Sequence, residues 1–65
     1  MMKISISKMS VAMVNAGVDS SKRLAEVAGV SVNTISRLRN GGSVKLPTLR
    51  SLAEALGVSP ADLIE

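Results

Sequence analysis

Side chains able to recognise DNA bases gather in one short segment, residues 32–40. If this segment is a helix with Ile35 facing inward, a rotation of about 100° per residue places its polar side chains on the opposite face. The side chains on that face are Asn33, Ser36, Arg37 and Asn40. Asparagine can pair bidentately with adenine and arginine with guanine, and Val32 at the boundary of the face can meet a thymine methyl group. These residue types match base recognition in double-stranded DNA, although any amphipathic helix presents a polar face to solvent.

Two helices joined by a turn of about three residues are predicted to position this face. The first helix has an apolar face made of Leu24, Ala25 and Ala28, and it ends at Gly29, which permits a left-handed turn. The residues able to cap its start are Asp19, Ser20 and Ser21. Ser31 can cap the second helix, which ends at residues 40–42. The residues that bury the elbow between the two helices are Val30, Ile35 and Leu38. The predicted motif spans about residues 21–39.

Regular apolar spacing predicts a further helix near the end of the chain. The side chains that share its face are Leu49, Leu52, Ala53 and Leu56. Pro47 suits the first turn of this helix, and Gly57 suits its exit. Ser59 then caps a short last helix that runs through Leu63 and Ile64.

The first residues permit two interpretations. Residues 3–7 alternate between polar and apolar types as a strand does, but a lone strand has no partner in a chain otherwise predicted to be helical. We therefore expect a helix from about Ser5 to Asn15, ended by Gly17. Val11 and Val14 fall outside its apolar face, so they either meet a partner subunit or complete a thin core.

The fold predicted from these elements is all-α: a compact bundle of about five short helices that forms one domain over residues 1–65. The chain has no cysteine and no histidine, and its acidic residues form no visible pair. We therefore expect no catalytic site, no metal site and no cofactor. It shows no signal peptide and no apolar run long enough to span a bilayer, which favours a cytoplasmic protein without a membrane partner.

Charge is distributed unevenly along the chain. Residues 22–50 carry six cationic side chains and one acidic side chain, whereas residues 51–65 carry three acidic side chains and no cationic one. Clustered cations gain affinity for a polyanion by releasing its counterions, although a solvated charged surface would have the same composition. The chain has no aromatic residue, which counts against single-stranded nucleic acid, since its bases bind by stacking.

The segment Leu24–Leu38, followed by Asn40-Gly41 and residues 47–58, resembles the lambda-repressor-like (Cro/CI-type, XRE-type) helix-turn-helix family. Small, turn-forming and apolar residues fall at the positions of the family motif, and the likeness covers most of the chain. The resemblance implies a DNA-binding fold in which Val32, Asn33 and Arg37 face base edges. By the same resemblance, the residues that contact phosphate or the adjacent groove include Ser31, Thr34 and Lys45.

The chain departs from the family pattern in two places. Where family members often hold an arginine against a glutamate, this chain has Met13 and Arg39, so the ion pair is absent and Arg39 becomes a candidate for phosphate. The glutamine that commonly opens the second helix is also missing, and a serine hydroxyl or helix amides would serve in its place. The predicted base-reading residues are Val32, Asn33, Ser36 and Arg37. Those predicted for phosphate or the adjacent groove are Ser20, Ser21, Ser31, Thr34, Arg39, Asn40 and Lys45.

Two functions are consistent with these observations. The first is a sequence-specific transcriptional regulator, a repressor of the phage or mobile-element type that occupies a palindromic operator as a homodimer. Its dimer surface would be the last helix, with Leu63 and Ile64, or the first helix, with Val11 and Val14. The second is an antitoxin-like module that inhibits a partner protein and binds DNA mainly in complex with it. An enzyme is the least favoured hypothesis, because no nucleophile–base pair and no cofactor motif is visible in the sequence.

Overall fold

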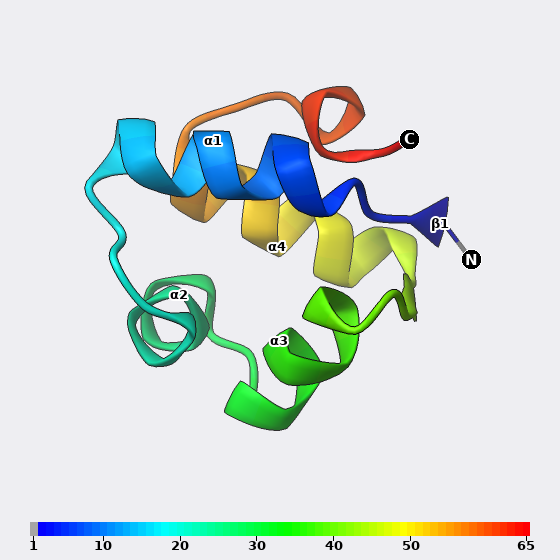
Figure 1. The fold of residues 1–65 in the computed structure, drawn as a ribbon, viewed down its shortest axis with the longest axis horizontal. Coiled ribbons are helices and arrows are strands. Elements are labelled where there is room, and N and C mark those ends of the chain that lie inside the picture. Colours follow the sequence, from blue (N-terminus) through cyan, green and yellow to red (C-terminus); the bar gives the residue numbers. More distant parts are fainter. Residues whose placement is uncertain (1) are drawn as a thin grey trace.

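The computed structural model describes residues 2–65, which form four α-helices, one 3-10 helix and a two-stranded sheet (Figure 1). The elements in chain order are β1 (Met2–Lys3), α1 (Ile6–Ala16), α2 (Ser21–Ala28), α3 (Val32–Arg39), β2 (Ser43–Val44), α4 (Leu46–Leu56) and η1 (Pro60–Leu63). The predicted domain starts at residue 1, which lies outside the described residues. The molecule measures 26 × 22 × 19 Å.

Serine caps define where three of the helices begin. Ser5, Ser20 and Ser31 precede α1, α2 and α3, and each side-chain oxygen accepts the backbone N–H of the residue three positions later, at 3.0 to 3.3 Å. Glycines end α1, α2 and α4 as expected. The two helices and the short turn predicted over residues 21–39 are therefore confirmed.

The prediction of an all-α fold is wrong at the N-terminus. β1 pairs with β2 in an antiparallel sheet, with Met2 opposite Val44, and Ile4 forms an isolated bridge with Ile64. Of the residues with strand-like alternation, Lys3 and Ile4 therefore have partners, some forty and sixty residues away along the chain, whereas Ile6 and Ser7 belong to α1. Contacts over such a separation depend on how the helices pack, so local spacing gave no sign of them.

The last predicted helix is a single 3-10 turn, η1. Ser59 and Asp62 form a capping box at its start, in which the Ser59 N–H donates to the Asp62 carboxylate at 3.2 Å. Leu63 is fully buried and Ile64 is partly buried. The five helices expected from the sequence correspond to four α-helices and this turn.

The core of the molecule surrounds α4. Figure 1 shows α4 in the middle, with α1 and η1 on one side and α2 and α3 on the other. α4 contacts α1, α2 and η1, and α2 also packs on α3. No polar or charged residue within the described part of the chain is buried. The buried side chains are Ile4, Met9, Ala12, Met13, Val18, Leu24, Ala25, Ile35, Leu38, Val44, Leu49, Leu52, Ala53, Leu56 and Leu63.

Two valines on α1 remain outside this core. Val11 is 61% exposed and Val14 is 78% exposed, so the interpretation that they complete the core is wrong. At about 100° per residue they lie roughly opposite Met9 and Met13, the buried methionines of α1, which leaves an apolar strip open to solvent. Among residues 2–65, no helix combines the length and the apolar character needed to cross a membrane.

Candidate nucleic-acid interface

The turn between α2 and α3 determines how α3 is presented. Gly29 ends α2 with φ 71°, a left-handed conformation that a side chain would strain, and the Val30 N–H then donates to the Ala25 carbonyl at 3.0 Å. Ala25 is buried where the helices meet, and Ile35 and Leu38 of α3 are fully buried. These contacts hold one side of α3 against the core, so its other side faces solvent.

The solvent-facing side of α3 is the polar face expected from the helical spacing. The predicted base-reading residues on α3 are all exposed, and they are Val32, Asn33, Ser36 and Arg37. Val32 is 46% exposed although it is apolar, and it lies in the first turn of the helix. The structure therefore agrees with the predicted exposure, while base contact itself stays a prediction.

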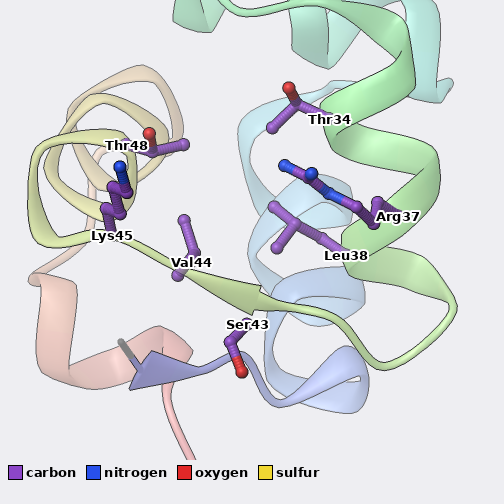
Figure 2. A pocket seen from close by; sticks show the side chains of 7 residues that line it. All are labelled: Thr34, Arg37, Leu38, Ser43, Val44, Lys45 and Thr48. Atoms are coloured by element: carbon purple, nitrogen blue, oxygen red, sulfur yellow. The ribbon is translucent and has the colours of Figure 1, made fainter.

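A hollow of about 490 Å³ lies between α3 and the start of α4. Figure 2 shows the Arg37 side chain extending from α3 into this hollow, across from Lys45 and Thr48 of the α4 start. The residues that line the hollow are Thr34, Arg37, Leu38, Ser43, Val44, Lys45 and Thr48. Helical spacing places Thr34 next to Arg37 on α3, and tertiary packing brings Lys45, a second residue predicted for phosphate, to the same hollow.

The hollow carries positive charge without acidic neighbours. Its lining contains Arg37 and Lys45 and no carboxylate. Within residues 2–65 the one ion pair joins Arg23 to Glu26 at 3.4 Å, so neither of the two cations in the hollow is neutralised by an acidic side chain. Lys45 also occupies the N-cap position of α4 without capping it through its side chain, which leaves first-turn amides of α4 open to another acceptor. Two cations and a helix N-terminus together favour an anion such as a backbone phosphate.

Ser31 and Thr34 form a connected pair at the start of α3. The Ser31 Oγ accepts the Thr34 N–H at 3.1 Å, and the two hydroxyl oxygens lie 2.9 Å apart. If Ser31 donates its proton to Thr34, the Thr34 hydroxyl retains a proton for an outside acceptor. The cap therefore both starts α3 and orients a donor at the edge of the hollow.

Replacing Ser31 by alanine should lower the free energy of unfolding by about 0.5 to 2 kcal/mol, because the Thr34 N–H loses its acceptor at the N-terminus of α3. Urea denaturation followed by circular dichroism measures the loss. Ser51→Ala is the matched control, since the Ser51 hydroxyl donates to the Pro47 carbonyl inside α4 and its removal should change stability by less than about 0.5 kcal/mol. Equal losses in the two variants would contradict the capping role.

The remaining predicted phosphate residues lie outside the hollow. Ser20 caps α2 and Ser21 is the first residue of that helix, so both stand at a second helix N-terminus. Asn40 is exposed at the end of α3. Arg39 points to the other side of the molecule, where its Nη1 lies 3.8 Å from the Met13 sulfur. The two positions that depart from the family's ion pair thus still touch, and Arg39 is not brought together with Lys45.

Two polar residues of the hollow were not predicted from the sequence. Thr48 lies in the first turn of α4 and Ser43 lies in β2, and both residues line the hollow. The proline at the start of α4 marks a helix N-terminus, and Thr48 follows it directly. Thr48 could therefore have been predicted as a residue of that N-terminus. Ser43 reaches the hollow through the β1–β2 pairing, for which the sequence carried no local signal.

Comparison with known proteins agrees with this geometry. A family model of the Cro/C1-type HTH DNA-binding domain matches residues 8–65. The chain belongs to this family. Antitoxin HigA-1 of Vibrio cholerae serotype O1 is 52% identical to the chain over 40 residues, which cover 62% of this chain and 38% of that antitoxin. Among solved structures, no match to the chain was found.

Membership of the Cro/C1-type family confirms the resemblance based on residues 24–38. The matched range begins inside α1 and includes the whole α2–α3 pair, the hollow and η1. β1 lies before the matched range, so its pairing with β2 is an addition to the part of the chain that the family model describes. The chain spans well under half of the length of the antitoxin that it resembles.

Proposed function

We propose that the protein is a sequence-specific transcriptional regulator that binds double-stranded DNA and acts by binding alone, without catalysis. The observation that carries this proposal is the exposed polar face of α3 beside a cationic hollow, in a Cro/C1-type domain. A major groove about 12 Å wide admits one α-helix. With α3 in the groove, the proposed contacts to base edges come from Val32, Asn33, Ser36 and Arg37.

The proposed phosphate contacts flank these residues. A phosphate at the rim of the groove can accept hydrogen bonds from Thr34, Lys45 and the first-turn amides of α4. Ser20 and Ser21 offer a similar contact at the N-terminus of α2. Such contacts hold the register of α3 in the groove, whereas the α3 side chains supply sequence preference. The proposed site of action is the cytoplasm.

High affinity for one operator requires two copies of the domain, because one copy contacts only a few base pairs. The longest dimension of the molecule is 26 Å, which is shorter than the roughly 34 Å between half-sites one helical turn apart. Two copies therefore fit side by side on one face of the DNA. This spacing permits a palindromic operator, and the proposed regulator is a repressor that excludes polymerase, as in regulators of phages and mobile elements.

A binding selection on random duplex DNA tests the proposal. At about physiological salt, we expect enrichment of a palindrome whose half-sites lie about 10 base pairs apart. Titration of the selected duplex across salt concentrations then counts the phosphate contacts from the slope of log affinity against log salt. Weak, salt-sensitive binding without any enriched sequence would contradict sequence-specific recognition.

Lys45→Ala should weaken binding to the selected duplex and to an unrelated duplex by the same factor, because a phosphate contact carries no sequence information. The salt slope should fall by about 1. Lys8→Ala removes the same charge from α1, on the side of α4 opposite α3 (Figure 1), together with a hydrogen bond from Lys8 Nζ to the Ile64 carbonyl at 3.1 Å. Measured below its unfolding transition, this variant should leave both affinities and the slope nearly unchanged. A loss confined to the selected duplex would instead make Lys45 a base-reading residue.

An antitoxin-like role is the second candidate, and the exposed strip of α1 favours it. Val11 and Val14 are exposed on α1, and α3 lies on the other side of α4 from α1 (Figure 1). A two-fold dimer through α1 would point its two α3 helices away from each other, so this strip suits a different protein better than a second copy on one operator. The last helix, the other dimer surface predicted from the sequence, cannot offer Leu63 to a partner, because this side chain is fully buried in the core.

Co-expression with the product of the adjacent gene tests the second candidate. A stable complex that survives gel filtration and tightens DNA binding would support an antitoxin-like role. A protein that selects its operator alone, with no complex formed, would leave the regulator as the function.

A further inference from the structure

Gly42 lies against Arg37 where α3 ends. The Gly41 N–H donates to the Leu38 carbonyl at 3.1 Å, and the Gly42 N–H donates to the Arg37 carbonyl at 3.0 Å. With Gly41 at φ 89°, these two bonds form a Schellman motif that closes the helix. In that motif the residue at the Gly42 position often carries an apolar side chain that packs on the last turn. Here that position has no side chain.

Arg37 occupies the space that such a side chain would need. A Cβ atom on Gly42 would lie 2.8 Å from the Arg37 carbonyl oxygen, 3.3 Å from its carbonyl carbon and 3.2 Å from its Cγ. Two of these atoms belong to the helix backbone and cannot swing aside. The third is the carbon through which the Arg37 side chain leaves the helix toward the hollow (Figure 2).

We propose that Gly42 is a positioning residue for DNA recognition, because its lack of a side chain lets Arg37 extend into the hollow beside Lys45. Any side chain at position 42 pushes on both the carbonyl and the Cγ of Arg37, which alters the last turn of α3 and the direction of the guanidinium. This role requires no contact between Gly42 and DNA. The inference rests on the proposed function and adds which residue sets the direction of the arginine.

Gly42→Ala tests the inference when it is compared with Gly41→Ala. Both variants alter the same turn, and each should lower Tm by roughly 5 °C. At Gly41 the cause is strain at a positive φ, since a Cβ there would meet no atom within 4 Å. The preferred duplex is first selected with the unmodified protein. The affinity of each variant for every single base-pair change in that duplex is then measured below the variant's unfolding transition.

We expect Gly42→Ala to lose affinity about tenfold, with the loss concentrated at the same base pair that Arg37→Ala affects. Gly41→Ala should retain the preference at that base pair. In the Arg37→Ala background, adding Gly42→Ala should change DNA affinity less than twofold, because the side chain to be positioned is gone. An equal loss in both backgrounds, or the same loss for Gly41→Ala, would overturn the positioning role.

A measurement on the unmodified protein serves if Gly42→Ala does not fold. Three-bond couplings from NMR should show one χ1 rotamer for Arg37 in the free protein, whereas averaging over several rotamers would overturn the proposal. This readout needs no DNA. If the unmodified protein selects no duplex but Arg37 holds a single rotamer, the proposed function fails while the contact between Gly42 and Arg37 stands.

Discussion

Arg37→Ala should weaken binding to the selected operator by about 1 to 3 kcal/mol and should flatten the base preference at one position in each half-site. The side chain is exposed on α3, it has no carboxylate partner within residues 2–65, and it carries a planar donor fork suited to guanine. Removing it takes away both a charge and a bidentate contact. Competition binding against every single base-pair change measures the preference directly.

Arg50→Ala provides the matched control for the charge. Arg50 is exposed on α4, and it lies about 200° around the helix from Thr48, which lines the hollow. We expect the removal of the Arg50 side chain to cost little operator affinity and to leave the base preference intact.

If Arg37→Ala leaves operator affinity unchanged, the placement of α3 in the major groove is wrong. If it weakens all duplexes equally and lowers the salt slope by about 1, Arg37 contacts phosphate instead.

Leu52→Ala should lower the free energy of unfolding by about 2 to 5 kcal/mol. Leu52 is fully buried on α4, the helix that packs against α1, α2 and η1, so its truncation leaves a cavity that several elements line. A chain of 65 residues without disulfides has little stability in reserve, and this loss can unfold it at ambient temperature. Urea denaturation at 10 to 25 °C, followed by circular dichroism, measures the change.

Val14→Ala is the control for that experiment. Val14 is 78% exposed on α1, so shortening it should change stability by less than about 0.5 kcal/mol. A destabilisation similar to that of Leu52→Ala would mean that α1 packs with Val14 inward, which would contradict the fold. Because DNA binding needs α3 held against the core, Leu52→Ala should also lose operator affinity in proportion to its unfolded fraction.

The α2–α3 unit could be predicted because its signals are local. Ser20 and Ser31 each accept an N–H three residues along the chain, and Gly29 closes the turn within the same few residues. The polar face of α3 follows from helical rotation alone, which is why its exposed residues were predicted correctly. The direction that each of these side chains takes from the helix was not predictable in the same way.

The misassigned parts involve contacts between distant residues. The sequence pattern at residues 3–7 was that of a strand, but the pairing of Lys3 with Ser43 and of Ile4 with Ile64 depends on where β2 and the end of the chain lie after the helices have packed. From the sequence, Val11 and Val14 could either meet a partner subunit or complete the core. Only the packing of α4 against the other side of α1 decided that they are exposed.

The sequence by itself therefore determined the helices, their caps and the helix-turn-helix, because hydrogen bonds between residues three to five apart and one apolar stripe per helix depend on neighbouring residues alone. Only the tertiary structure decided the small sheet, the exposed strip of α1 and the hollow that Arg37 lines together with Lys45 and Thr48. Those features depend on the angle and distance between packed helices. These quantities are determined by the whole core at once rather than by any one segment.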